Sequence, residues 1–206
     1  MKNLDKIRIR SNEELKKQNF GLKELSQVLS DIKVNHFITG GTLLGAIREK
    51  NFIKWDWDVE ITILTDEIFD KREKLSQLFI DSGFQISKYL DQYDSLKWEL
   101  KKYNCFYEIV GFYKEGGWMY RLGKGAKVPA SFFVKPSDLF FLGNLYKTVS
   151  EPNKYLEFCY GDWQNPKRTA NKKEYLTLEH IPRLKIYNIF FQKIKNIFIR
   201  FKKNEI

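Results

Sequence analysis

Acidic and apolar residues alternate between positions 56 and 61, shortly after a glycine pair. Because the side chains of a strand point alternately to its two faces, this pattern predicts a strand with one acidic and one apolar face. The acidic face carries Asp56, Asp58 and Glu60, and the apolar face carries Trp57, Val59 and Ile61. Neighbouring carboxylates on one face lie about 6.5 Å apart and repel one another unless a cation lies between them. We therefore interpret the strand as a divalent-metal site that faces a phosphate.

Acidic alternation also occurs on exposed strands that have no chemical role. Two features favour a cleft here. The flanking residues Phe52, Ile53 and Ile63 are apolar, and the pair Gly40-Gly41 precedes the strand. Together they predict a half-buried strand whose carboxylates line a cleft.

The glycine pair lies between a predicted strand over 36–39 and a predicted short helix over 42–49, which Thr42 opens. The N-terminus of a helix presents unpaired backbone N–H groups and the positive end of the helix dipole, so it attracts phosphate. A glycine pair alone indicates only a turn. Its position upstream of the acidic strand makes Gly40, Gly41 and Thr42 the predicted phosphate-binding turn.

Two basic residues bracket the acidic strand and are candidates for contact with phosphate. Arg48 lies near the end of the predicted short helix, and Lys54 lies just before the acids. A guanidinium at this place can bind either the carboxylates or a phosphate. The alternative for Arg48 is a structural ion pair with Asp56 or Glu49.

Glu108 is a lone acid within an apolar stretch over 105–113. A buried carboxylate is costly unless it is paired or bound to metal. We predict that a neighbouring strand brings Glu108 to the metal site as a fourth carboxylate. The alternatives are an exposed edge position or a lysine or arginine partner.

Helical and strand patterns alternate along the rest of the chain. A capping box at Ser11 and Glu14 begins a helix that runs to about residue 33, and Asp66 caps a helix over 67–81 that Gly83 ends. The remaining pattern predicts strands over 84–90, 96–102, 105–113 and 118–122, a basic glycine-rich loop over 123–130, an apolar stretch over 132–145, and a helix over 153–160 that Gly161 closes.

The composition narrows the class of partner and the compartment. The 206 residues are 43% hydrophobic and carry a formal net charge of +10, which favours polyanionic partners. Two cysteines make neither a disulfide framework nor a metal motif, and neither a signal peptide nor a membrane-spanning run is evident. We therefore expect a cytoplasmic protein.

Residues 181–206 differ from the domain predicted over 1–180. They contain seven lysines and arginines but one acid, and their aromatic and aliphatic residues fall on one helical face. This pattern is typical of an amphipathic helix at an interface, so residues 183–203 are expected to bind the anionic surface of the inner membrane face. The alternative is a terminal helix that packs on the domain with its basic face in solvent.

With these motifs in place, the chain resembles the LicD-type phosphotransferases, which include bacterial phosphocholine transferases and fukutin-related ribitol-phosphate transferases. The first motif has the family pattern of a glycine pair, T-L-L-G-A, an arginine and W-D-x-D. It matches at Gly41, Thr42, Leu43, Leu44, Gly45, Ala46, Arg48, Trp55, Asp56 and Asp58. A second block over 155–163, Y-L-E-F-C-Y-G-D-W, resembles the family's C-terminal motif, with Pro166 after it.

The resemblance implies a nucleotidyltransferase-like α/β (α+β) fold, with a mixed sheet flanked by helices. It also implies transfer of a phospho-alcohol from a CDP-activated donor to a sugar hydroxyl, with release of CMP. Carried over by position, Asp56 and Asp58 are metal ligands, Gly40-Gly41 is the phosphate-side turn, and Glu108 is the partner carboxylate. Mg²⁺ is the expected metal, with Mn²⁺ as the alternative. The expected acceptor is a cell-surface glycan or its lipid-linked saccharide precursor, as in lipopolysaccharide, teichoic acid or capsule.

This chain departs from the family pattern at three positions: Glu60 and Glu108 replace aspartates, and Trp57 replaces a residue that is often polar. Because the acidic replacements keep the charge, we expect an active enzyme.

CDP-choline is the preferred donor, since abundant aromatic residues can surround a quaternary ammonium. Two other hypotheses stay open: a nucleotidyltransferase that releases pyrophosphate, and a non-catalytic basic module that binds membrane or nucleic acid. Nucleic acid is not the expected partner of the enzyme.

Overall fold

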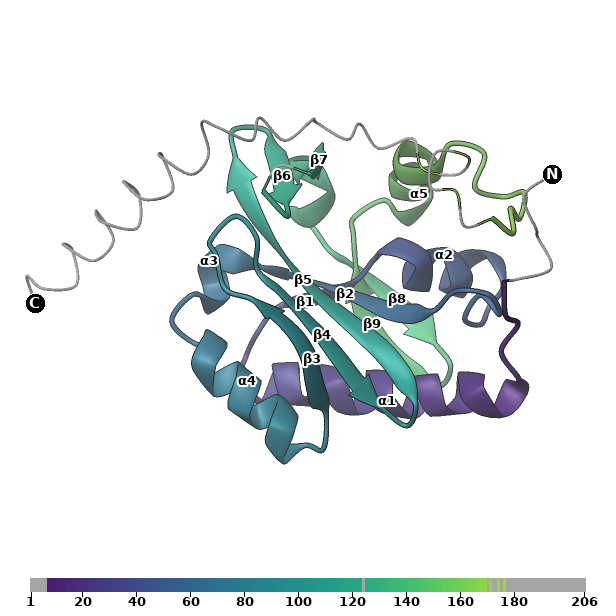
Figure 1. The fold of residues 1–206 in the computed structure, drawn as a ribbon. Coiled ribbons are helices and arrows are strands. Elements are labelled where there is room, and N and C mark those ends of the chain that lie inside the picture. The colour runs from purple at the N-terminus through teal and green to yellow at the C-terminus, as the bar shows by residue number, and fades with distance from the viewer. Residues whose placement is uncertain (1–6, 124, 170, 172–173, 175, 177–206) are drawn as a thin grey trace, which may run out of the picture.

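The computed structural model describes residues 7–123, 125–169, 171, 174 and 176. Within these residues, one mixed sheet of nine strands crosses the molecule (Figure 1). Its main path has the order β3-β4-β5-β2-β1-β9-β8, and β6 and β7 extend it from the end of β5. The strands are β1 His36–Ile38, β2 Asp58–Leu64, β3 Gln85–Leu90, β4 Lys97–Lys102, β5 Cys105–Glu115, β6 Trp118–Arg121, β7 Ala126–Pro129, β8 Ser137–Phe141 and β9 Asn144–Thr148.

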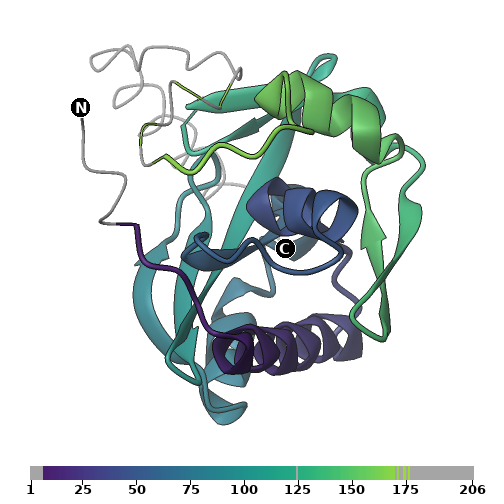
Figure 2. The ribbon, with the colours of Figure 1, turned by 90° about the vertical axis from the view of Figure 1, so that its right-hand side faces the viewer.

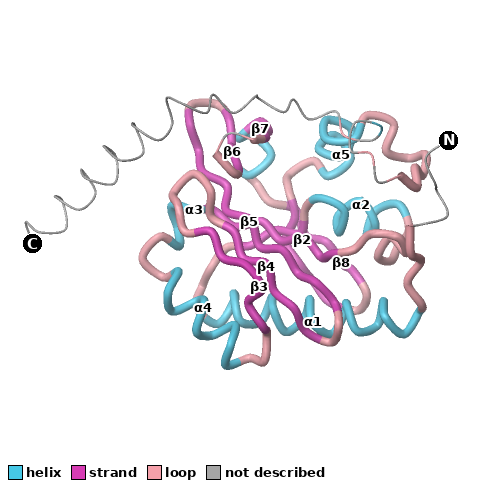
Figure 3. Tube along the Cα trace, in the orientation of Figure 1, coloured by secondary structure: helices cyan, strands magenta, loops and turns pink. Residues whose placement is uncertain are grey.

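Helices lie on both sides of the sheet (Figure 3). On one side α1 (Asn12–Asp31) packs against β5 and α4 (Arg72–Asp81), and on the other α2 (Gly40–Arg48) packs against β2 and α5 (Pro152–Tyr160). Figure 2 shows α5 in green beside α2 in blue, away from α1 in purple. Two short elements, α3 (Thr65–Ile68) and the 3-10 helix η2 (Ala130–Phe133), complete the described chain. The α/β class with a mixed sheet flanked by helices is confirmed.

Local signals set most of these boundaries. The capping box at Ser11 and Glu14 is present at the start of α1, and Gly83 and Gly161 adopt positive φ values of 79° and 60° just after α4 and α5. Only glycine takes this conformation without a steric penalty, so both helices end where the sequence predicts.

Strand β2 has two chemically different faces. Val59, Ile61 and Ile63 are buried in the core that α1 covers. Glu60 lies on the opposite face, toward α2, because its carboxylate accepts a hydrogen bond from the backbone N–H of Gly41. The predicted alternation is therefore confirmed within β2. It is wrong for Trp57, which precedes the strand, is 54% exposed and lines the same cavity as the acids.

The structure corrects the start of two elements. Strand β2 begins at Asp58, so Asp56 lies in the preceding loop and not within the strand. Helix α2 begins at Gly40, so the glycine pair forms the first turn of the helix and is not a separate turn before it.

The predicted helix over 67–81 is interrupted near its start. A turn over 69–71, closed by a hydrogen bond of 2.8 Å from the backbone N–H of Lys71 to the carbonyl of Ile68, separates α3 from α4. Asp66 is not an N-cap; its carboxylate instead accepts a hydrogen bond of 2.6 Å from the hydroxyl of Tyr93.

The predicted loop over 123–130 is also wrong, because residues 126–129 form β7 and pair with β6. Ala126 and Val128 are buried and alternate with less buried neighbours, as in a strand. The amphipathic tail over 181–206 lies outside the described residues, so the division at residue 180 stays a prediction. No described helix is both long and apolar enough to cross a membrane.

Candidate active site

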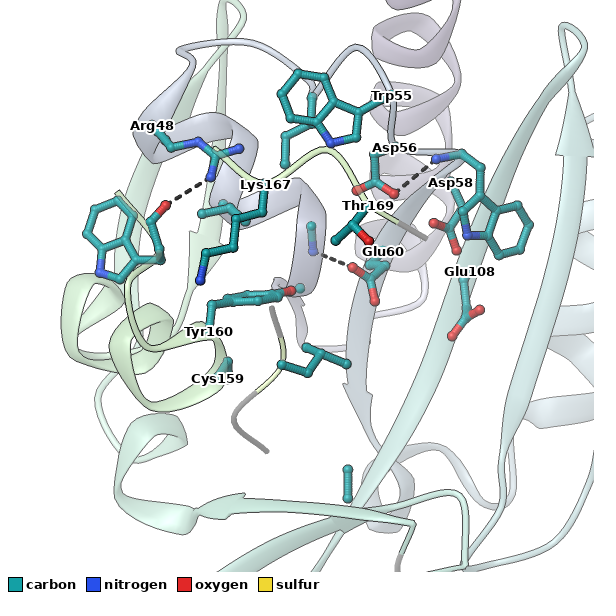
Figure 4. Close-up of a pocket in the computed structure, with 18 of the residues that line it drawn as sticks. Arg48, Trp55, Asp56, Asp58, Glu60, Glu108, Cys159, Tyr160, Lys167 and Thr169 are labelled. Atoms are coloured by element: carbon teal, nitrogen blue, oxygen red, sulfur yellow. Dashed lines mark hydrogen bonds between the residues drawn. The ribbon is translucent and has the colours of Figure 1, made fainter. Parts of the chain in front are cut away.

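A cavity of about 770 Å³ opens on the α2 side of the sheet (Figure 4). Its walls come from the first turn of α2, the start of β2, the middle of β5, the ribbon of β6 and β7, and α5 with the segment that follows it. Elements far apart in the sequence therefore meet around one space, and both sequence motifs contribute to it.

The four predicted carboxylates, Asp56, Asp58, Glu60 and Glu108, all line this cavity. Strands β2 and β5 are parallel, and their register places Glu60 directly beside Glu108. Asp58 and Glu60 are two positions apart on β2 and so share its face. Asp56 reaches the same cavity from the loop before β2, and Figure 4 shows the four side chains together.

The carboxyl group of Asp58 is the most buried of the four, with 8% of the residue exposed. Burial, followed by the charges of Glu60, Asp56 and Glu108, raises its pKa to about 9, against a smaller opposing effect of Lys97. A protein cannot hold this many carboxylates in one cavity in the charged form unless a cation compensates them. The donor set is therefore suited to a hard divalent cation, which prefers oxygen ligands.

The side chains do not form a closed metal cage as they lie. Among the described residues, no group of three or more histidine, cysteine or acidic side chains is arranged to hold a metal ion. Mg²⁺ commonly binds one or two protein carboxylates and takes its other ligands from water and substrate phosphates. An open arrangement with Asp56 and Asp58 as the protein ligands thus fits this metal.

The glycine pair allows α2 to approach the carboxylates closely. A Cβ atom at Gly40 would collide with the carboxylate of Glu60, and one at Gly41 would collide with that of Asp56. The Thr42 hydroxyl accepts a hydrogen bond of 2.7 Å from the backbone N–H of Glu60. Gly41 and Thr42 therefore fix the first turn of α2 against β2, a role that the sequence pattern does not indicate.

The two predicted cations lie in different places. Arg48 lines the cavity, but its guanidinium pairs with Glu49 at 2.8 Å and donates to the carbonyl of Trp163 at 2.9 Å. It thereby joins α2 to the segment after α5, so the two sequence motifs are in contact. Lys54 is exposed and is not among the residues that line the cavity.

Glu108 has a lysine partner, which was one of its predicted alternatives. The ammonium of Lys97 on β4 lies 2.6 Å from Glu108 and 2.8 Å from Glu99. Burial lowers the pKa of Lys97, but hydrogen bonds to these two carboxylates raise it more, so the net shift is upward. Glu108 thus belongs to the cavity and to an ion-pair network at the same time.

Several residues of the cavity wall were not foreseen. Tyr155 and Tyr160 come from α5, and burial raises the pKa of both phenols well above the ordinary value. Arg121 comes from β6; burial lowers its pKa, but Glu60 and other nearby groups raise it more. The second motif contained a signal for the two tyrosines, whereas nothing near Arg121 in the sequence marked it.

Two segments meet at the edge of the cavity. Ile7 and Arg10 line it from the chain before α1, and Lys167 and Thr169 line it from the chain after α5. The guanidinium of Arg168 donates a hydrogen bond to the carbonyl of Ile7, which links the two segments.

Comparisons with known proteins identify the family to which the chain belongs. Residues 33–147, more than half of the chain, match the family model described as LicD/FKTN/FKRP, nucleotidyltransferase domain. The lipopolysaccharide cholinephosphotransferase LicD of Haemophilus influenzae is 42% identical over 53 residues, which are 26% of this chain and 17% of that protein. The match therefore spans less than a fifth of the relative's length.

An antibiotic adenylyltransferase and an antibiotic-resistance factor are among the similar solved structures. The lincosamide adenylyltransferase LnuA, bound to lincomycin, is 13% identical, with 81% of this chain and 93% of that chain covered and a TM-score of 0.49. The resistance factor ANT(2'')-Ia is 12% identical, with 66% of each chain covered and a TM-score of 0.48.

The family match spans α2, β2 and β5, and these two strands carry three of the four carboxylates. This chain therefore belongs to the LicD/FKTN/FKRP family and contains its nucleotidyltransferase domain.

Proposed function

We propose that this protein is a metal-dependent phosphotransferase that moves a phospho-alcohol from a CDP-activated donor to a sugar hydroxyl of a cell-surface glycan and releases CMP. The observation that carries the proposal is the group of four carboxylates that line one cavity beside the first turn of α2. The family, and the cholinephosphotransferase name of the relative, support the class of reaction.

Asp56 and Asp58 would hold Mg²⁺, or Mn²⁺ in its place, with Glu60 and Glu108 nearby in the cavity. When bound, the metal would neutralise phosphate charge and orient the phosphate for attack. Two features would keep this carboxylate group in place. The N–H of Gly41 binds Glu60, and Lys97 binds Glu108.

In the proposed reaction the sugar hydroxyl attacks the phosphorus that carries the alcohol. A new P–O bond forms to the sugar, the bond to the bridging oxygen breaks, CMP leaves with that electron pair, and the proton of the hydroxyl passes to the solvent. Positioning of the two substrates and compensation of charge supply most of the rate in phosphoryl transfer. The cavity walls would provide the positioning.

Phosphocholine is the first candidate for the transferred group. Trp55, Tyr155 and Tyr160 line the cavity, and aromatic side chains can bind a quaternary ammonium. Phosphoethanolamine, glycerol phosphate and ribitol phosphate are the alternatives. A lipid-linked saccharide is the proposed form of the acceptor, and residues 183–203 would then bring the enzyme to the anionic inner membrane face.

Product analysis tests this proposal. The purified protein is incubated with Mg²⁺ and each CDP-alcohol, or with CTP, together with candidate saccharides, and the released CMP and pyrophosphate are measured. CMP release that depends on both a CDP-alcohol and a saccharide supports the phosphotransferase. Pyrophosphate release from CTP identifies a nucleotidyltransferase instead, and release of neither product from the whole panel contradicts both reactions.

A further inference from the structure

Six basic side chains line the cavity within the described residues, and most of them already have partners. Arg48 and Lys97 are held by the contacts described above. Arg8 pairs with Glu14, and Lys167 donates a hydrogen bond to the carbonyl of Glu174. Only Arg10 and Arg121 have a guanidinium without an ion pair or hydrogen bond to a described residue. These two are therefore the cations that a bound anion can engage without displacing a partner.

Arg121 occupies a defined place on the sheet. In the antiparallel pairing it lies opposite Phe112 on β5 and opposite Ala126 on β7. Residues that face each other across paired strands lie on the same face of a sheet, so Arg121 shares a face with both. Phe112 is four residues after Glu108 on β5, so the two side chains lie on the same face of the sheet. Arg121, which lies opposite Phe112, is therefore on the face that carries the carboxylates.

The surroundings of Arg121 leave its guanidinium available. Its Cζ atom lies 5.9 Å from the centre of the Phe112 ring, which supports the side chain from one side. Ala126, its neighbour on β7, has only a methyl group and cannot compete for the five N–H donors. Among the charged and polar groups that act on Arg121, Glu60 has the largest favourable electrostatic effect, and no ion pair joins the two residues.

Arg10 has a different position. Its backbone N–H donates to the carbonyl of Lys54 at 2.7 Å, and the strongest attraction on its guanidinium comes from Asp56. It therefore lies beside the loop that carries Asp56. Arg121 is held by a strand with neighbours on both sides, so its position does not depend on a loop.

We propose that Arg121 binds a phosphate group of the nucleotide donor, across the cavity from the carboxylates that would hold the metal. This inference rests on the proposed function and adds a binding residue to it. The planar guanidinium can engage two phosphate oxygens at once, and a partly buried site makes each of these charge-assisted hydrogen bonds stronger than in water. The phosphate would lie between two positive charges, the metal and Arg121.

The test compares Arg121→Gln and Arg121→Lys with wild type in calorimetric titrations with Mg²⁺ present. The probes are inorganic pyrophosphate, CDP-choline and cytidine. Because hydrogen bonds between charged groups contribute about 1.5–3 kcal/mol, we expect Arg121→Gln to weaken both phosphate probes by roughly ten- to a hundredfold. Arg121→Lys should be intermediate because it keeps the charge and loses the fork geometry. Cytidine binding, which involves no phosphate, should not change.

Lys114→Gln is the matched control, because it removes one positive charge from an exposed position of β5 that does not line the cavity. It should bind all probes as wild type does. Equal affinity of Arg121→Gln and wild type for both phosphate probes would overturn the inference while leaving the proposed transfer intact. An equal loss of cytidine binding would also overturn it, since the residue would then act through the fold.

The two proposals fail in different ways. CDP-choline transfer that persists in Asp58→Asn would contradict the metal-dependent reaction, while a pyrophosphate affinity that falls in Arg121→Gln would still support the anion site. A wild-type protein that binds neither pyrophosphate nor CDP-choline would overturn the assignment of Arg121.

Discussion

The two faces of β2 perform opposite tasks with the same backbone. On the α1 side, Val59, Ile61 and Ile63 are almost fully buried and contribute to the core. On the α2 side, Asp58 and Glu60 gather like charges at a cavity, which lowers stability in the absence of a cation. The strand is therefore stabilised on one face, while the other face carries the proposed metal site, so substitutions on the two faces should have separable effects.

The largest effect on stability is expected from the apolar face. Ile61→Ala removes a side chain that is 1% exposed and leaves a cavity in the core. Such substitutions cost about 2–5 kcal/mol of unfolding free energy. Urea denaturation followed by circular dichroism measures the change. A loss below about 1 kcal/mol would contradict the assignment of this face to the core.

Gly41→Ala should reduce turnover, through the side chains of the acidic face, more than it reduces the stability of the fold. The new Cβ atom would collide with the carboxylates of Asp56 and Glu60. To avoid it, the two side chains would have to rotate away from their present positions in the cavity. Because small displacements of catalytic groups are costly, we expect a fall in turnover of roughly a hundredfold, with a change in unfolding free energy near 1 kcal/mol.

The matched control for this glycine is Gly117→Ala. An added Cβ atom there meets nothing within 4 Å, and the residue lies in the turn between β5 and β6. It should keep both turnover and stability. If the two alanine variants were equally active, the close approach of α2 to the carboxylates would have no functional role.

A smaller effect is expected on the pH dependence of stability, through His36 on the α1 side of the sheet. Burial lowers the pKa of His36 from 6.5, with a weaker opposing effect of its hydrogen bond to the carbonyl of Val34. The folded state therefore favours the neutral ring, so His36 contributes stability above pH 6.5 that is lost as the pH falls through its lowered pKa. Denaturation curves of wild type and His36→Gln between pH 7 and 5 should show a flatter dependence for the variant. Parallel curves would contradict this assignment.

The smallest effect is expected for Lys54→Gln. This side chain is exposed and does not line the cavity, so turnover and substrate affinity should stay within about twofold of wild type. Arg48→Gln should reduce turnover more, because Arg48 holds the carbonyl of Trp163 beside the cavity. Steady-state kinetics of the two variants gives the ranking, and a greater loss in Lys54→Gln would restore that residue as a phosphate ligand.

The sequence predicts those parts of the site that depend on local pattern. Alternation along β2 gives the face of Asp58 and Glu60, and the glycine pair marks the start of α2. Asp56 shows the limit of this reasoning, because the acidic pattern continues into residues that precede the strand.

Residues that depend on strand order are not available from local pattern. Lys97 reaches Glu108 because β4 pairs with β5, and Arg121 reaches the cavity because β6 folds back on the end of β5. Strand β7 was missed since its four residues follow a glycine-rich turn. Neither register nor pairing can be read from one segment alone, which explains why the second half of the site emerges only from the fold.

The central claim is that the carboxylates of the acidic face hold a metal against a nucleotide phosphate. Calorimetric titration of CDP-choline with and without Mg²⁺, on wild type, Asp58→Asn and Asp138→Asn, tests it most directly. Asp138 is an exposed control whose ion pair with Lys147 lies on β8 and β9. We predict Mg²⁺-dependent binding by wild type and Asp138→Asn, and its loss in Asp58→Asn with no loss of stability. Binding by Asp58→Asn with wild-type affinity and Mg²⁺ dependence would contradict the account.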